Sequence, residues 1–236
     1  GRAARPCGRG AVVGLHDGRP VVYLVGTSGH PNYGDELITA NWLRFLARTA
    51  PDAEVWLDSP FPGRSDVLHG DLHPNLRCVD TLFHACWNAP TDSPEATVEY
   101  GRRVIGEPGL IPREATGVES LSRVDLVHIV GGGYINALWP SHLALFGAAQ
   151  GLAERYGART ALTGAGLTPH VEGSLDALRE ILAGFDVVDV RRLLFDRQHR
   201  RRERDDGRLG EHGMIEPFGP RPDERASGHR AERADL

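Results

Sequence analysis

The sequence contains no lysine, so all 27 basic residues are arginines, and it has three cysteines among 236 residues. The cysteines (Cys7, Cys78 and Cys86) are odd in number and lack the spacing of a disulfide framework, which indicates a reducing compartment. No apolar run approaches the length of a membrane-spanning helix, and the apolar segment at 11–15 is too short for a signal peptide. These absences predict a cytoplasmic protein with no integral membrane segment.

An excess of charge of one sign is also lacking, since 27 basic residues face 32 acidic ones for a net charge of −5. Arginine is concentrated after residue 190, yet 12 arginines there meet 10 acidic residues, which nearly cancel them. A nucleic-acid partner needs a basic surface. We therefore predict that the protein does not bind nucleic acid.

Three segments of different character divide the chain. Residues 1–19 show little periodicity and are predicted to be a loose N-terminal extension. Residues 20–191 alternate between apolar runs and amphipathic stretches, as a folded domain does. Residues 192–236 hold too few apolar side chains to offset their ordering entropy, so we predict a disordered tail. The abrupt change also leaves open a reading-frame shift as the origin of this tail.

Within the middle segment, short apolar runs predict buried strands and longer amphipathic stretches predict helices. Strands are expected at 20–26, 53–57, 76–82, 125–130, 160–163 and 186–190, with helices at 35–49, at 93–105, from Ser141 and from Ser174. The first helix should bury Ile38, Trp42, Phe45 and Leu46. Strands that alternate with helices are typical of a doubly wound, mostly parallel, Rossmann-like α/β sheet.

The stretch from 125 to 169 organises this domain. An apolar strand ends at three glycines, Gly131, Gly132 and Gly133, and after a helix a second strand ends at Gly164 and Gly166. Parallel strands joined by a helical crossover bring both glycine turns to the carboxyl edge of one sheet, where ligands bind in open α/β folds. Glycines let backbone N–H groups approach an anion. Tight packing between helix and sheet explains the presence of these glycines equally well.

Polar residues follow the first and last strands at the same edge. Asn32, Gly34 and Asp35 open the first helix, and Arg191 follows the last strand. The Asp35 carboxylate could accept a proton from an attacking hydroxyl, or serve only as an acidic residue at a helix N-terminus. Arg191 could pair with a carboxylate or phosphate, or form a surface ion pair.

Three motifs occur in order: H-P-N-Y-G-D-E-L-I after the first strand, V-G-G-G-Y-I, and G-A-G-L-T-P followed by F-D-V-V-D-V-R. Together they resemble the polysaccharide pyruvyl transferase family over residues 20–191. The resemblance implies a lobe of a glycosyltransferase-B-like, two-lobed protein. It also implies transfer of a pyruvyl group from phosphoenolpyruvate to a hydroxyl pair of a cell-surface polysaccharide or glycolipid, with no other cofactor.

The resemblance covers the N-terminal lobe of a usual member. The family's R-D-x-x-S continuation is absent, because Arg191 is followed by Arg192 and Leu193. We therefore expect a truncated chain without the second lobe, which leaves its activity open. A glycosyltransferase-like enzyme that uses a nucleotide sugar, and a non-catalytic half-domain that binds a sugar or associates with itself, are the alternatives.

Other candidate side chains have structural interpretations. Histidines and cysteines crowd one segment, but their spacing and Pro74 argue against zinc, so no metal site is predicted; they are His69, His73, Cys78, His84 and Cys86. His128 is expected in the core, whereas His30 and His170 lie in loops at the ligand edge and could assist acid–base chemistry. Trp42 and Trp139 are interpreted as core or rim residues rather than sugar-stacking platforms.

Overall fold

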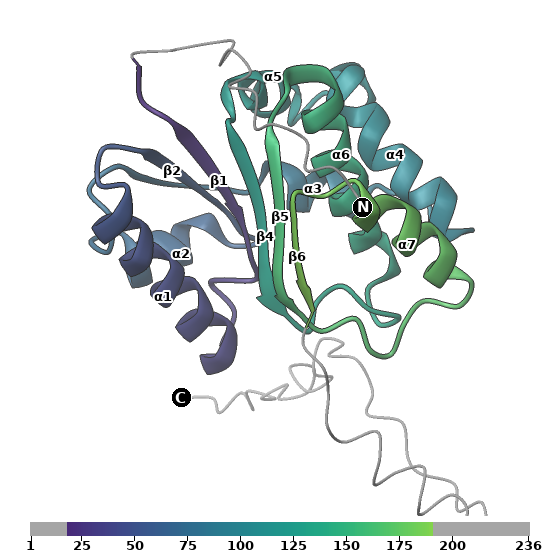
Figure 1. Cartoon of the computed structure of the whole chain (residues 1–236), viewed down its shortest axis with the longest axis horizontal. Coiled ribbons are helices and arrows are strands. Elements are labelled where there is room, and N and C mark those ends of the chain that lie inside the picture. The colour runs from purple at the N-terminus through teal and green to yellow at the C-terminus, as the bar shows by residue number, and fades with distance from the viewer. Residues whose placement is uncertain (1–17, 191–236) are drawn as a thin grey trace, which may run out of the picture. The chain divides into compact units, whose positions relative to one another are not determined.

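The computed structural model describes residues 18–190, which form a six-stranded sheet with helices on both faces (Figure 1). All five strand pairings are parallel, in the order β3-β2-β1-β4-β5-β6. The strands are β1 (Val21–Val25), β2 (Glu54–Asp58), β3 (Leu76–Val79), β4 (Leu126–Gly132), β5 (Arg159–Ala165) and β6 (Val187–Val190). The predicted doubly wound α/β class is confirmed, and the mostly parallel sheet is wholly parallel.

Seven helices and three short 3-10 turns connect these strands within the described range. The helices are α1 (Tyr33–Thr49), α2 (Pro62–His69), α3 (Thr81–Trp87), α4 (Pro94–Gly106), α5 (Ala115–Ser120), α6 (Ala144–Tyr156) and α7 (Ser174–Ala183). The turns are η1 (Pro108–Leu110), η2 (Leu121–Arg123) and η3 (Pro140–Leu143). None of these helices is both long and apolar enough to cross a bilayer.

Several boundaries differ from the sequence predictions. The predicted strand at 76–82 ends at Val79, because α3 begins at Thr81. β4 continues through Gly131 and Gly132 rather than ending at Val130, since both glycines still pair with β5. Ser141 lies inside η3 and caps no helix; α6 begins three residues later, without a side-chain cap.

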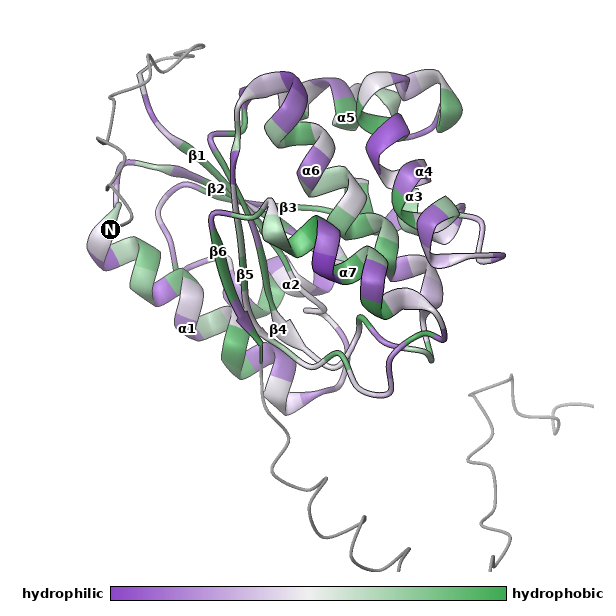
Figure 2. Cartoon of the chain, turned by 45° about the vertical axis from the view of Figure 1, so that its right-hand side comes forward, coloured by the Kyte–Doolittle hydropathy of each residue, from purple (hydrophilic) through white to green (hydrophobic). Residues whose placement is uncertain are grey.

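Two hydrophobic cores lie on opposite faces of the sheet. Along β4, Val127 and Ile129 point into the larger core, while Val130 belongs to the smaller core beside α1, as the twofold periodicity of a strand requires. In Figure 1, α1 and α2 lie on one side of the sheet and α4, α6 and α7 on the other. Hydrophobic and hydrophilic residues alternate along α1 and α7, which are amphipathic surface helices (Figure 2).

Helix α1 packs on a face slightly rotated from the predicted one. Leu43 and Leu46 are buried, and Ile38 and Trp42 are partly buried against the smaller core. The prediction for Phe45 is wrong, because that ring is 43% exposed. Phe45 instead packs edge-on against Trp42, at 5.6 Å between ring centroids.

Helices α4 and α6 approach each other closely through glycines. A Cβ atom on Gly101 would lie 2.0 Å from the carbonyl oxygen of Ala144, and one on Gly147 would lie 1.9 Å from that of Val98. Both positions therefore require glycine for the helices to pack backbone to backbone. This contact fixes α6, and with it the loop that precedes it, against α4.

The order of the strands places a switch point between β1 and β4. From β1 the chain runs outward through β2 and β3, then returns to pair β4 with the other side of β1. Loops that leave the carboxyl ends of β1 and β4 diverge to opposite faces and leave a crevice between them. Asn32 and Asp35 follow the first of these strands, and Gly133 follows the second.

Candidate active site

Asn32 both begins α1 and orients Asp35. Its side-chain oxygen accepts a hydrogen bond from the Gly34 N–H at 3.0 Å, which is the N-cap interaction of α1. Its amide nitrogen donates to Asp35 Oδ2 at 2.8 Å. The Asp35 carboxylate is therefore held in the first turn of the helix, at the carboxyl end of β1.

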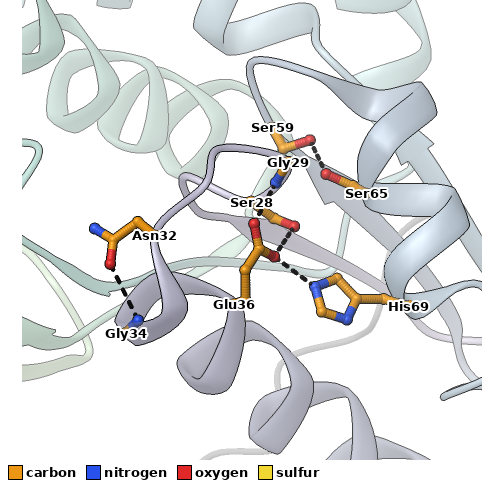
Figure 3. Close-up of polar contacts among 8 residues, drawn as sticks. All are labelled: Ser28, Gly29, Asn32, Gly34, Glu36, Ser59, Ser65 and His69. Carbon is orange, nitrogen blue, oxygen red and sulfur yellow. Dashed lines mark hydrogen bonds and ion pairs between the residues drawn. The ribbon is translucent and has the colours of Figure 1, made fainter.

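The loop between β1 and α1 is fastened by Glu36 (Figure 3). The Gly29 N–H donates to Glu36 Oε1 at 2.8 Å, and the Ser28 hydroxyl donates to Oε2 at 2.8 Å. From α2, the His69 Nε2 contacts the same Oε2 at 2.8 Å. One carboxylate thus joins the loop, α1 and α2, and fixes the path of the chain just before His30.

Glycine is required at position 29 of this loop. Its φ is +83°, and a Cβ there would lie 2.7 Å from the carbonyl oxygen of Phe61. The next residue, His30, packs its ring edge-on against Phe61 at 4.7 Å between centroids. Close approach of the loop to Phe61 therefore decides where the His30 imidazole lies.

The three glycines after β4 have three different environments. A Cβ on Gly131 would lie 2.4 Å from the carbonyl oxygen of Gly164, so this glycine serves close pairing of β4 with β5. A Cβ on Gly132 would lie 2.7 Å from the Tyr134 ring and 3.2 Å from Asp35 Oδ1. Gly133 has open space around the corresponding position and is exposed. Only Gly133 leaves its backbone accessible to a ligand.

Tyr134 and His142 form the wall behind Gly133. The buried Tyr134 hydroxyl shares its proton between the carbonyl oxygens of Val130 (2.8 Å) and Val25 (3.1 Å), which joins β4 to β1. His142 Nδ1 donates to the Tyr134 carbonyl at 2.7 Å, which leaves Nε2 as the nitrogen with a lone pair. Burial lowers the pKa of His142, and the hydrogen bond to Tyr134 offsets part of that shift. The imidazole is therefore neutral near pH 7.

Asp58 at the end of β2 anchors α3 beside this wall. Its buried carboxylate accepts hydrogen bonds from the Leu82 N–H at 2.6 Å, from the Phe83 N–H at 3.4 Å and from the Tyr23 hydroxyl. Burial raises the pKa of Asp58 to about 7, and these donors counteract only part of the effect. The carboxylate supplies the cap that the α3 N-terminus otherwise lacks.

A cavity of about 400 Å³ opens between these elements at the switch point. Residues from the ends of β1, β2 and β4 and from the adjoining helices line it: Thr27, His30, Pro31, Asn32, Asp35, Pro60, Trp87, Gly133, Tyr134, Trp139 and His142. The Thr27 hydroxyl is buried and has no hydrogen-bond partner among residues 18–190. A buried polar atom without a partner in the wall of a cavity is the kind of group that a bound ligand or water satisfies.

The cavity brings together three of the residues singled out in the sequence, namely Asn32, Asp35 and Gly133, together with His30.

Gly34 is exposed and contributes its N–H to the cap of α1. Gly131 and Gly132 lie in β4, and Gly164 and Gly166 lie at the end of β5; none of the four lines the cavity. The Gly164 N–H donates to Asp189 and the Gly166 N–H to the Gly132 carbonyl, so both are used within the fold. Arg191 lies outside the described residues.

Sequence reasoning missed several lining residues. Tyr134 and His142 follow the glycine triplet, so their position after a strand at the ligand edge could have indicated them. Trp87 carried no such signal, because it ends a helix, α3, that the sequence did not predict. Trp139, interpreted as a core or rim residue, lies at the rim and is 48% exposed.

The histidines and cysteines between 69 and 86 have separate environments. Within 18–190, no group of three or more His, Cys, Asp or Glu side chains is placed to hold a metal ion. His69 contacts Glu36, and His73 Nε2 contacts the Ala50 carbonyl at 3.3 Å.

His128 is buried in the smaller core, as predicted, with its ring 4.4 Å from that of Trp42 and its pKa lowered by burial to about 4.

Similarity to known proteins identifies the family of this chain. No curated protein matches the chain. A family model, however, described as polysaccharide pyruvyl transferase, matches residues 32–191, about two thirds of the chain. The match begins at the residue that caps α1 and takes in the ends of β4, β5 and β6, so it covers the elements that build most of the cavity. The chain belongs to the polysaccharide pyruvyl transferase family.

Proposed function

We propose that this protein takes part in transfer of a pyruvyl group from phosphoenolpyruvate to a pair of saccharide hydroxyls, and that the reaction takes place at the cavity beside Asp35. The observation that carries the proposal is the meeting of Asn32, Asp35 and Gly133 around one cavity at the switch point, in a chain of this family. Ligands of parallel α/β folds bind at the switch point, because the loops that follow β1 and β4 diverge there and leave a crevice.

The reaction balances without a redox partner. One saccharide hydroxyl adds to C2 of phosphoenolpyruvate while the methylene carbon C3 gains a proton and becomes a methyl group. The second hydroxyl then displaces phosphate from C2, and the proton that it loses leaves with the phosphate. The products are a cyclic ketal and inorganic phosphate, so the protein has to supply a base for each hydroxyl and an acid for C3.

We assign the base for the attacking hydroxyl to Asp35. Its carboxylate lines the cavity, and Asn32 fixes one of its oxygens at 2.8 Å. The neutral His142, whose Nδ1 is committed to the Tyr134 carbonyl, has only Nε2 with which to exchange a proton with a ligand. The exposed His30 supplies a second imidazole on the cavity wall. Gly133 lets a ligand approach the backbone closely, and Thr27 offers a hydroxyl with no partner in the described fold.

Binding of the donor requires positively charged groups in addition to the residues that line this cavity. Phosphoenolpyruvate carries a carboxylate and a phosphate, which call for guanidinium groups, yet no arginine lines the cavity within residues 18–190 and the Asp35 carboxylate repels anions. Arg191 directly follows β6 and is our candidate for a donor contact. The cavity itself suits the neutral, hydroxyl-rich acceptor better than the donor.

The melting temperature of the whole chain, with and without phosphoenolpyruvate, tests the proposed activity. A ligand that binds only the folded state raises the melting temperature. We expect a rise with phosphoenolpyruvate and none with a nucleotide sugar such as UDP-glucose. A rise with UDP-glucose alone would replace the proposal with a glycosyltransferase-like function. No rise with either ligand, on a cooperatively melting protein, would indicate a domain that does not bind the donor.

A further inference from the structure

Two exposed tryptophans stand on the wall of the cavity. Trp87, the last residue of α3, is 52% exposed, and Trp139, in the loop before η3, is 48% exposed. The chain has four tryptophans, and the other two are packed: Trp56 is buried and Trp42 is partly buried against His128. Both indoles that face solvent therefore belong to the same cavity.

Such exposure is unusual for the largest apolar side chain. Tryptophan has most of its surface buried in folded proteins, and exposed apolar patches commonly mark binding sites. Leu138, next to Trp139, is 68% exposed and enlarges the apolar surface at this rim. The cavity wall thus presents aromatic surface together with the polar side chains of Asn32 and Asp35.

Each indole lies beside an imidazole ring. The Trp139 ring lies at 14° to the His142 ring, 6.4 Å between centroids, and His142 is fixed by its bond to the Tyr134 carbonyl. The Trp87 ring contacts His84 at 4.5 Å between centroids, on a helix whose first turn Asp58 anchors. The contact with His84 restricts the Trp87 indole before a ligand arrives, and such restriction lowers the entropic cost of binding.

From these contacts we propose that Trp87 and Trp139 form the acceptor subsite, in which the apolar C–H faces of sugar rings pack against the two indoles. This inference rests on the proposed function. A pyranose ring has an apolar face and a rim of hydroxyls, so a cavity lined by indole surface and by carboxylate and amide groups complements both parts. The cavity wall has no arginine within 18–190, which favours a neutral saccharide over an anionic ligand. The two tryptophans then decide which sugars reach Asp35.

Intrinsic tryptophan fluorescence of the whole chain tests the subsite without the donor. The probes are methyl glucoside, methyl galactoside, methyl mannoside, lactose, cellobiose and N-acetylglucosamine. At least one probe should shift the emission to shorter wavelength and protect the indoles from acrylamide. Trp87→Ala and Trp139→Ala should each weaken binding of that sugar roughly tenfold, by loss of aromatic contact. Binding to these variants is followed by saturation-transfer NMR.

Three further variants separate the subsite from a general loss of structure. Trp87→Phe and Trp139→Phe keep an aromatic face and should recover most of the affinity. Phe45→Ala removes a comparably exposed ring, 43%, that does not line the cavity, and should leave sugar binding unchanged. Equal loss in the Ala and Phe variants of either tryptophan would overturn the stacking role.

The outcomes also separate this inference from the proposed function. Sugar binding that depends on the tryptophans, without any response to phosphoenolpyruvate, would support the subsite and contradict the transferase. Pyruvyl transfer with an unchanged KM for the acceptor in both Ala variants would support the transferase and overturn the subsite. Protection of the indoles by UDP-glucose but by none of the neutral sugars would also overturn it.

Discussion

Gly132 of β4 and Asp35 of α1 meet across the switch point: a Cβ atom on Gly132 would lie 3.2 Å from Asp35 Oδ1. The same atom would lie 2.7 Å from Cδ1 of Tyr134. The missing side chain therefore lets the carboxylate and the tyrosine ring share the end of β4. Glycine at 132 shapes the site although it does not line the cavity.

The first prediction concerns this contact. Gly132→Ala forces the Tyr134 ring to move and presses on Asp35, so we expect destabilisation by about 1–3 kcal/mol and a lower kcat for pyruvyl transfer. Gly133→Ala is the matched control for stability alone, because nothing lies within 4 Å of its Cβ position but the residue lines the cavity. Chemical denaturation and steady-state kinetics measure the two effects. Equal stability of Gly132→Ala and the wild type would contradict the packing argument.

A second prediction concerns the clamp formed by Glu36. Glu36→Ala leaves the Gly29 N–H, the Ser28 hydroxyl and His69 without their shared acceptor, which should cost about 1–3 kcal/mol of stability. The loop that carries His30 should loosen, so the KM for the acceptor should rise more than kcat falls. Glu36→Gln keeps one acceptor oxygen and should restore part of both.

The control for the clamp is Glu99→Ala on α4. Glu99 pairs with Arg102 at 2.6 Å on the surface, and exposed ion pairs contribute about 0–1 kcal/mol. Hydrogen exchange of the Gly29 amide measures the clamp directly. Unchanged protection in Glu36→Ala would show that other contacts hold the loop.

The third prediction concerns pH. Burial raises the pKa of Asp58 from 3.8 to about 7 in the folded state, so the folded protein binds a proton more tightly than the unfolded chain does. The stabilisation by this proton is complete below the unfolded pKa and is lost as pH rises through the folded pKa. Relative to Asp58→Asn, the free energy of unfolding of the wild type should fall by up to about 1.4 kcal/mol per pH unit between the unfolded and the folded pKa of Asp58.

Comparison with Asp58→Asn is needed because a second group acts in the opposite direction. Burial lowers the pKa of His128 from 6.5 to about 4, so its contribution to stability is lost as pH falls through that range. The His128 effect cancels between the two proteins. Urea denaturation across the pH window provides the measurement, and a difference independent of pH would refute the buried, protonated Asp58.

A fourth prediction tests the contact between α4 and α6. Gly147→Ala places a methyl group 1.9 Å from the Val98 carbonyl oxygen and should destabilise by about 1–3 kcal/mol or more. Gly63→Ala, in α2 with nothing within 4 Å of the new methyl, should be neutral or stabilising by up to about 1 kcal/mol. Thermal melting distinguishes the two, and similar effects from both would contradict the close helix contact.

Periodicity in the sequence predicted the sheet well, because buried parallel strands are short, apolar and β-branched. β1 is the run V-V-Y-L-V and is buried throughout. The order of the motifs placed Asn32 and Asp35 at the correct edge, because parallel crossovers leave little choice of topology. The helix from Ser93 was predicted with its cap, and the Ser93 hydroxyl accepts from the Ala96 N–H at 3.1 Å.

What the sequence could not predict depends on contacts between distant segments. Helix α3 is only seven residues long and is capped by Asp58 of β2 rather than by a residue of its own. Gly131 and Gly132 looked like a loop, but pairing with β5 extends the strand through them. The link from Glu36 to His69 spans 33 positions and has no local signature.

The most direct test of the account is pyruvyl transfer by the whole chain and by Asp35→Asn. Phosphoenolpyruvate labelled with ¹³C at C3 is incubated with the sugar that binds best, and the ketal methyl group is followed by NMR. We predict ketal and phosphate in equal amounts from the wild type, and a loss of at least roughly a hundredfold in kcat for Asp35→Asn with sugar binding retained. Wild-type rates in Asp35→Asn, or no ketal from the wild type with any sugar that binds, would contradict the account.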